Sequence, residues 1–356
     1  MKYALAVATL VVAGLAGAAA AQDSVGDLRV LVIRATWGPT PDNSAPLAAA
    51  APFYDRASFG KLRLHLSITP WLRTYSGPIC PGDEAAAKAA ANGAGYDVDS
   101  YARIVEVVPE EVCDFNGVAR GNDILLTVPG ALVHELGHTF GLQHATAYVC
   151  GHGGCRHIDE YGDPLSPMGH GALDFSAYEK LKLGWITSVQ RAEGSRTYAV
   201  ADIDVPSDAP QALVVPTAAG EYWIEHRGDD TRRLIVRLRA RTGRTIYIAR
   251  PLDRYVTAKV FSVTSGFGFK WLDRTRPSAP RVRALDQTLL SWSRSSDAAS
   301  GVAGYRVTID GRLLATTTGT QTALPELHKG GHRAAVVAID RAGNRSRPGV
   351  VPLNVS

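Results

Sequence analysis

Three histidines and one glutamate fall within the eleven-residue segment 134–144. On a helix, His134 and His138 are four residues apart and share one face, so two imidazole nitrogens can reach one metal ion at about 2.0 to 2.1 Å. Gly141 tolerates the positive φ that would end the helix and bring His144 round as a third ligand. Three imidazoles with a fourth position left for water indicate a catalytic zinc site.

Glu135 lies beside this metal face, where it is a poor ligand but can reach a metal-bound water. We therefore expect its carboxylate to act as a general base. The alternative interpretation is a solvated helix with ordinary polar residues and a glycine cap. Leu132, Leu136 and Phe140 recur at four-residue spacing and would anchor the opposite side of the helix in a core, which favours the zinc helix.

The segment His-Glu-Leu-Gly-His-Thr-Phe-Gly-Leu-Gln-His resembles the signature of the metzincin metallopeptidases, HExxHxxGxxH followed by a methionine turn beneath the zinc. Met168, the only methionine besides the first residue, is the candidate for that turn. Residues 159–169 and 180–185 look specifically like the gametolysin-type secreted peptidases, and they are also similar to the immune-inhibitor-A type. The resemblance covers roughly residues 28–230.

The resemblance implies an α/β catalytic domain, of the α+β kind, with a mixed sheet and a zinc-binding helix, followed by β-sandwich regions. It also implies a secreted endopeptidase that uses one zinc ion to hydrolyse peptide bonds of extracellular proteins or glycoproteins. His170 stands two residues after Met168, where some metzincins carry a tyrosine that touches the zinc or the developing oxyanion. A transition-state role and a supporting or surface role for His170 both stay open.

Two other functions are compatible with the motif. The first is a catalytically silent adhesion or matrix-binding protein that retains the zinc fold and binds through its C-terminal sandwiches. The second is the same metal chemistry directed at an amide that is not a peptide. The intact Glu135 favours the enzyme over the silent protein.

The elements that must position the zinc helix lie upstream of it. Residues 28–34 are apolar on both faces and predict a central strand of a covered sheet. The Ala-rich stretches and the alternating runs supply the other elements. We expect helices at 44–58 and 83–91, and strands at 62–68, 103–108 and 123–128.

Short β-rich runs follow the zinc helix. They are residues 197–205, 221–225 and 245–249, and the basic stretch 232–244. In the basic stretch, Arg233, Arg237, Arg239 and Arg241 alternate with apolar residues, which predicts a strand with a solvated face.

Beyond residues 273–280, where Arg, Pro and Ser dominate, the chain resembles a fibronectin type III module with Trp292 on an early strand of a seven-stranded sandwich. The expected organisation is a signal peptide at 1–21, a zinc peptidase domain at 22–190, a β-rich domain packed on it at 191–273, and a fibronectin type III-like sandwich at 274–356.

The N-terminus predicts export. Lys2 precedes an Ala/Val/Leu run that ends in Ala19-Ala20-Ala21, as in a secretory signal peptide. No second hydrophobic span follows, so we expect a secreted extracellular protein without a stable membrane anchor, with the periplasm or the cell surface as alternatives. The net charge of +4 is too small to imply a nucleic-acid partner, and we expect a monomer.

The four cysteines form an even set, which in an exported protein indicates disulfides. We favour Cys80 with Cys113, and Cys150 with Cys155, because the second pair closes a short glycine-containing loop. The alternative for the second pair is a structural zinc site with the ligands Cys150, His152, Cys155 and His157.

The acidic loop between His144 and Met168 is a candidate site for a second metal. Asp159, Glu160 and Asp163 could hold calcium through hard oxygen ligands. The alternative is a solvated loop without an ion.

Overall fold

The computed structural model describes residues 23–40, 42–109, 112–151, 154–228, 234–241, 243–248, 260–264 and 266–355, without the side chains of 149–158. The expected signal peptide lies outside the described residues. The chain divides into two compact units, the first Met1–Gln143 with Asp174–Ile186, the second His144–Leu173 with Thr187–Ser356. Among the described residues, no helix is long and apolar enough to cross a membrane.

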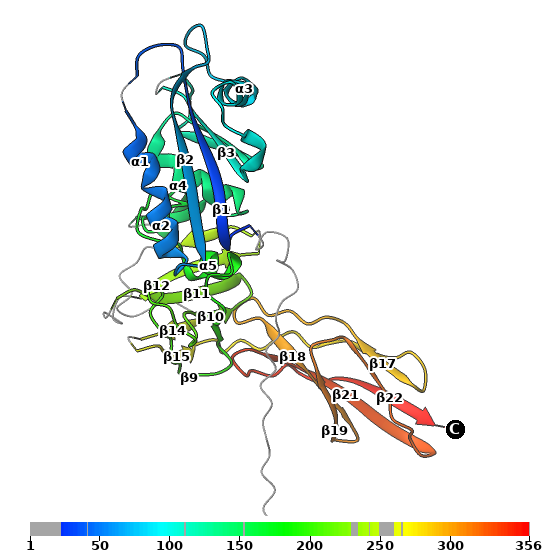
Figure 1. Ribbon diagram of the computed structural model, residues 1–356. Coiled ribbons are helices and arrows are strands. Elements are labelled where there is room, and N and C mark those ends of the chain that lie inside the picture. The colour runs from blue at the N-terminus through cyan, green and yellow to red at the C-terminus, as the bar shows by residue number, and fades with distance from the viewer. Residues whose placement is uncertain are drawn as a thin grey trace, which may run out of the picture. The chain divides into compact units, whose positions relative to one another are not determined.

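The first unit is built on a five-stranded sheet with the order β2-β1-β3-β5-β4 (Figure 1). The pairs β1–β2, β1–β3 and β3–β5 are parallel, and β4 is an antiparallel edge strand on β5. The mixed sheet predicted for the catalytic domain is therefore confirmed. The strands are β1 (Gly26–Thr36), β2 (Leu62–Arg73), β3 (Arg103–Val107), β4 (Gly117–Arg120) and β5 (Asp123–Leu126).

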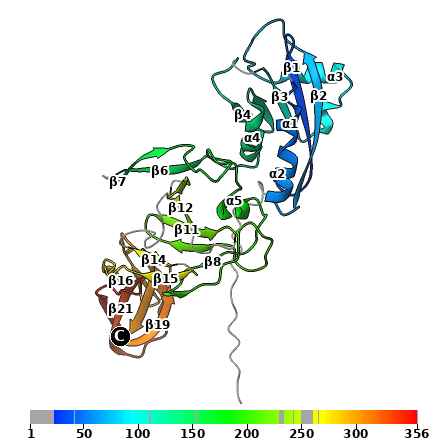
Figure 2. The same ribbon diagram turned by 90° about the vertical axis from the view of Figure 1, so that its left-hand side faces the viewer.

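Both faces of β1 are covered, as its apolar sequence predicts. Leu31 and Ile33 pack against α3 in one buried cluster, whereas α2 and α4 lie on the opposite side of the sheet (Figure 2). Val30 and Val32 are also fully buried. The helices of this unit are α1 (Ser44–Ala48), α2 (Ala50–Ala57), α3 (Ala85–Gly93), α4 (Leu132–Thr139) and α5 (Ala177–Lys182), with 3₁₀ turns η1 (Val98–Ser100) and η2 (Pro129–Ala131).

The single helix predicted over 44–58 is wrong in one respect, because the structure divides it at Ala49 into α1 and α2. Pro52 has no backbone N–H and cannot bond the carbonyl of Ala48, so a continuous helix would lose a hydrogen bond there. The predicted disulfide between Cys80 and Cys113 is confirmed, with an S–S distance of 2.04 Å.

The second unit begins with a seven-stranded sheet of order β7-β6-β13-β12-β11-β10-β8 and a three-stranded sheet of order β14-β15-β9. A buried core of aliphatic and aromatic side chains, among them Tyr222, Phe261 and Trp271, draws on both sheets. The strands are β6 (Ala145–Gly151), β7 (Gly154–Asp159), β8 (Gln190–Arg191), β9 (Arg196–Thr197), β10 (Leu213–Pro216), β11 (Gly220–His226), β12 (Leu234–Ala240), β13 (Thr245–Tyr247), β14 (Phe261–Val263) and β15 (Gly268–Trp271).

The strand predicted over 197–205 is mostly wrong, because only Arg196–Thr197 is a strand there. The Asp202 carboxylate accepts a hydrogen bond of 2.8 Å from the backbone N–H of Asp204. Such a local bond from an aspartate to the backbone two residues on competes with a strand ladder.

The C-terminal part of the second unit has two sheets, β16-β17-β20 and β19-β18-β21-β22. Trp292 and Tyr305 lie in their buried core with ring centroids 5.6 Å apart. Seven strands in two sheets with a core tryptophan agree with the sandwich predicted here. The strands are β16 (Val282–Ala284), β17 (Leu289–Trp292), β18 (Val302–Ile309), β19 (Arg312–Thr317), β20 (Gln321–Ala323), β21 (Gly330–Asp340) and β22 (Gly349–Val355).

Candidate metal centre

Helix α4 presents His134 and His138 because its other side is anchored in the core. Leu132, Leu136 and Phe140, the apolar residues at four-residue spacing, are each at most 1% exposed. With these side chains buried, the helix cannot rotate about its axis. The two imidazoles are therefore held on the side away from that core.

The helix ends where the glycine of the motif predicts. Gly141 has a φ of 81°. The N–H of Gly141 bonds the carbonyl of His138 at 2.8 Å, and the N–H of Leu142 bonds the carbonyl of Gly137 at 3.1 Å. This pair of bonds is a Schellman motif, which satisfies carbonyls of the last turn and reverses the chain direction. The reversal carries His144 back toward the helix.

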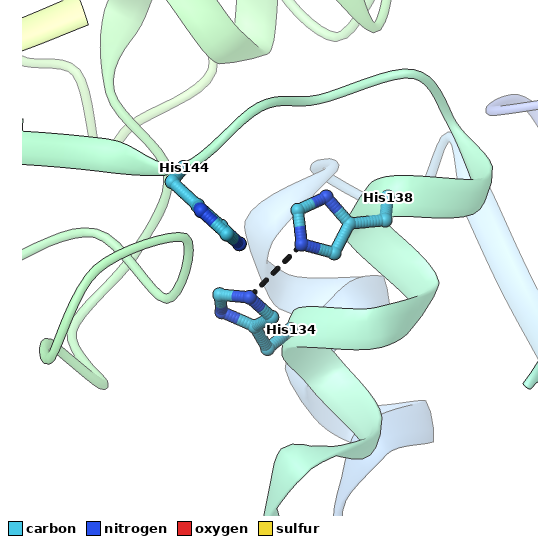
Figure 3. A group of neighbouring side chains, drawn as sticks. All are labelled: His134, His138 and His144. Carbon is cyan, nitrogen blue, oxygen red and sulfur yellow. Dashed lines mark hydrogen bonds between the residues drawn. The ribbon is translucent and has the colours of Figure 1, made fainter. Parts of the chain in front are cut away.

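The three imidazoles of this continuous segment meet at one point (Figure 3). One ring nitrogen from each of His134, His138 and His144 lies within 4.8 Å of the others. The Nε2 atoms of His134 and His138 are 3.0 Å apart. Two nitrogens bound to one tetrahedral zinc ion at 2.0 to 2.1 Å would be about 3.3 Å apart. The donor set and its spacing fit a zinc ion.

In His138 and His144, a hydrogen bond at Nδ1 fixes which ring nitrogen faces the point where the three imidazoles meet. His138 Nδ1 donates to the carbonyl of Leu142 at 2.9 Å. His144 Nδ1 donates to the Glu160 carboxylate at 2.9 Å, and this bond lowers the pKa of Glu160. Because Nδ1 carries the proton in both rings, the Nε2 lone pairs are left for a metal, as in many histidine metal sites.

Glu135 is buried beside the histidines on the side of α4 that faces β4. The residue is 5% exposed. Burial raises the pKa of Glu135 to about 7, opposed by a hydrogen bond from the backbone N–H of Ala119. The carboxylate is thus an acceptor held against the edge strand of the sheet.

The predicted methionine turn is hydrogen-bonded to the residue that follows His144. Met168 is fully buried, and its carbonyl accepts a bond of 2.8 Å from the N–H of Ala145. The turn is closed by the N–H of Gly169, which bonds the carbonyl of Ser166 at 2.9 Å. Its position relative to the backbone at His144 is therefore fixed.

Tyr161 is a neighbour of the site that the sequence did not single out. Its ring centroid lies 4.2 Å from that of His144 and 5.9 Å from that of His170. The N–H of His170 bonds the carbonyl of Tyr161 at 2.7 Å. Sequence spacing gives no signal for this contact, because Tyr161 lies 17 residues after His144, beyond the β6–β7 hairpin whose strand pairing brings it back beside His144.

The solvated face predicted for the basic strand is wrong at Arg237. This side chain is 1% exposed, and its guanidinium contacts Asp163 Oδ2 at 2.7 Å and Glu225 Oε1 at 2.6 Å. Asp163 also accepts bonds from the N–H groups of Leu165 and Ser166. A buried arginine requires such paired carboxylates.

The three acidic residues proposed for calcium have other partners. Asp163 pairs with Arg237 and Glu160 bonds His144. Asp159 Oδ1 accepts a bond of 3.1 Å from the N–H of Tyr161. Among the described residues the acidic group whose oxygens do cluster within 4.8 Å is elsewhere, at Asp273, Asp297 and Asp340.

The second cysteine pair is only partly described. The backbones of Cys150 and Cys155 are directly opposite in the β6–β7 hairpin. Their side chains lie outside the described residues, as do those of His152 and His157, so both the second disulfide and the structural zinc site stay predictions.

Comparison with known protein families finds one that matches this chain. Residues 42–247 match the family described as Gametolysin peptidase M11. A search of the curated proteins finds no match.

Solved structures give weaker similarities. Archaemetzincin from Methanopyrus kandleri is 17% identical, with a TM-score of 0.28, over 46% of this chain and 96% of that one. The fibronectin(III)-like modules of Clostridium thermocellum CbhA are 16% identical, with a TM-score of 0.20, over 22% and 96%. The glycoside hydrolase domain of Endo-D from Streptococcus pneumoniae is 17% identical, with a TM-score of 0.20, over 25% and 17%.

Proposed function

The chain belongs to the gametolysin peptidase M11 family, and from this we propose that it is a secreted zinc endopeptidase that cleaves peptide bonds of extracellular proteins or glycoproteins. The observation that carries the proposal is the cluster of three imidazoles with a buried carboxylate beside it. Export is supported by the Cys80–Cys113 disulfide, since such bonds persist in oxidising compartments.

His134, His138 and His144 would hold one zinc ion through ring nitrogens. When bound, zinc supplies Lewis-acid chemistry, polarising the scissile carbonyl and lowering the pKa of water. Glu135 takes the proton of the attacking water and later passes it to the leaving amine nitrogen. The burial of Glu135 suits this exchange, because it brings the pKa of the carboxyl close to neutral.

Three further residues support the site in this proposal. The turn at Met168 holds the backbone next to His144 through the bond from Ala145. Tyr161 packs on the ring of His144, and His170 lies next to Tyr161. We propose that His170 acts through this tyrosine and keeps the third ligand in place. Calcium in the acidic loop is not needed for any of these steps.

The experiment that tests the function is a digest of a broad peptide library by the mature protein, with and without a metal chelator, beside elemental analysis of zinc. We expect about one zinc per chain and cleavage that the chelator abolishes. Zinc without cleavage of any peptide would instead favour the adhesion protein. Zinc-dependent hydrolysis restricted to other amides would favour the non-peptide substrate.

A further inference from the structure

Strand β4 contacts the side chain of Glu135 at two positions. The backbone N–H of Ala119 donates a hydrogen bond to the carboxylate. At Gly117, an added Cβ would lie 2.7 Å from Glu135 Cγ and 2.9 Å from Oε1. Both distances are shorter than real Cβ contacts, so the backbone of β4 and the Glu135 side chain touch with no room for a methyl group between them.

The lack of space for a side chain, rather than the backbone conformation, accounts for the glycine at position 117. Among the described residues, those with positive φ do not include Gly117, so its backbone does not require glycine. A glycine inside a strand weakens the strand and often marks the close approach of another group. Here that group is Glu135, which at 5% exposure has little room to move aside.

The sheet also resists a retreat of β4. Gly117 pairs with Leu126 of β5, and Leu126 pairs with Val107 of β3. A methyl group at position 117 would therefore be accommodated mainly by a shift of the Glu135 side chain, or by a shift of Leu126, whose Cδ2 would lie 2.8 Å from it.

We propose that Gly117 is a positioning residue of the hydrolytic site, which lets β4 hold the Glu135 carboxylate where it can take a proton. The proposal rests on the proposed function in one respect, namely that Glu135 is the base. A base must lie within about 2.6 to 3.2 Å of the proton donor in the reactive complex. Misplacement by about 1 Å can lower turnover about a hundredfold.

The test compares Gly117→Ala with Gly130→Ala, a matched control. Gly130 lies in the turn before α4, and an added Cβ there meets nothing within 4 Å. For Gly117→Ala we expect kcat to fall by about 10- to 100-fold while KM stays within about twofold, with zinc retained. Gly130→Ala should keep parental kinetics. A parental kcat for Gly117→Ala, an equal loss in Gly130→Ala, or a change confined to KM would overturn the proposal.

A variant at Leu126 distinguishes a displaced Glu135 carboxylate from a packing defect at Leu126. Leu126→Val removes the Cδ2 atom that a methyl group at position 117 would also meet. If the defect arises at Glu135, the double variant Gly117→Ala with Leu126→Val should stay as slow as Gly117→Ala. Recovery of kcat in the double variant, relative to Leu126→Val alone, would show that the defect was packing against Leu126 and would refute the proposal.

A crystal structure of Gly117→Ala provides a readout that does not depend on activity. We expect the Glu135 carboxylate to move by about 1 Å or more while the three imidazoles keep their spacing. An unmoved carboxylate would overturn the positioning role. If the parental protein cleaves no peptide, the proposed function fails, and the position of Glu135 in this structure still decides whether Gly117 sets it.

Discussion

His138 and His144 each use Nδ1 for an outer hydrogen bond, to the Leu142 carbonyl and to the Glu160 carboxylate. These bonds select one tautomer and orient each ring before a metal arrives. Glu135 has a different environment, buried and held by a backbone N–H. The proposed function gives metal binding and proton transfer to different residues within one motif, so substitutions should separate the two.

Glu135→Gln keeps the size of the side chain and removes its basicity. Zinc content should stay near one per chain, because the three imidazoles are unchanged. General-base catalysis contributes about 10² to 10⁴-fold, so peptide turnover should fall at least about a hundredfold. Elemental analysis beside peptide hydrolysis measures both quantities.

His138→Ala is the counterpart of this variant, since it should lose the metal itself, and added zinc should restore little activity. A Glu135→Gln protein that retains zinc and cleaves at the parental rate would refute the role of Glu135.

A second buried acid, Glu106, makes stability depend on pH. Burial raises the pKa of Glu106 to about 7, although its Oε1 accepts a bond of 2.5 Å from the Tyr75 hydroxyl. Between about pH 4.5 and pH 7 the native state therefore binds more protons than the unfolded state, and stability falls as the pH rises.

Glu106→Gln removes this titration and keeps an acceptor for Tyr75. The free energy of unfolding of the variant minus that of the parent should rise by on the order of 2 to 3 kcal/mol between pH 5 and pH 8. Urea unfolding of both proteins at the two pH values measures it. An unchanged difference would mean that Glu106 titrates normally in the folded chain.

At the scale of elements, strand β12 connects to the methionine turn through a buried charge network. Arg237 of β12 contacts Asp163 and Glu225, and Asp163 also accepts N–H groups of the segment that leads to Met168. Removing one member of such a network leaves the others buried without a counter-charge, which is more damaging than replacing all of them.

Arg237→Leu should therefore lower the free energy of unfolding by about 3 to 5 kcal/mol. The matched control is Arg239→Leu on the same strand, whose side chain is 41% exposed and whose guanidinium lies 3.8 Å from Glu221 Oε2. The exposed pair of Arg239 with Glu221 should contribute at most about 1 kcal/mol to the free energy of unfolding. Urea unfolding of both variants measures the two changes in the free energy of unfolding. Equal losses of stability in the two variants would contradict the role given to the buried contacts of Arg237.

At the scale of the whole molecule, polar contacts of Asp273 and Ala218 join the C-terminal sandwich to the rest of its unit in the part of the chain that the structure describes. Asp273 Oδ2 accepts a bond of 2.6 Å from Ser300 Oγ, and the N–H of Ala218 bonds the Ala299 carbonyl at 3.1 Å. The chain between Asp273 and Pro280 is free of helix and strand. We propose that this segment is a domain boundary.

A chain that ends at Asp273 should keep parental kcat and KM on short peptides, with a lower melting temperature because the bonds to Ser300 and Ala299 are lost. Peptide hydrolysis and thermal unfolding of the shortened and full chains measure these effects. Loss of peptide cleavage by a shortened chain that stays folded would mean that the sandwich belongs to the active site.

The sequence alone determined the local parts of the site. The four-residue spacing of His134 and His138 places both on one face of any helix, and Gly141 permits the turn that returns His144. The apolar pattern of residues 28–34 likewise predicted a covered central strand. These features follow from backbone periodicity and from one residue's allowed φ, so they need no knowledge of the distant chain.

Only the tertiary structure decided the contacts between distant segments. Arg237 is buried because Asp163, 74 residues earlier, reaches it, although its alternation with apolar neighbours predicted exposure. Gly117 meets Glu135 because β4 pairs at the edge of the sheet beside α4. Sequence periodicity tells which residues share a face, but which strands pair and what covers them is set by the packing of the whole chain.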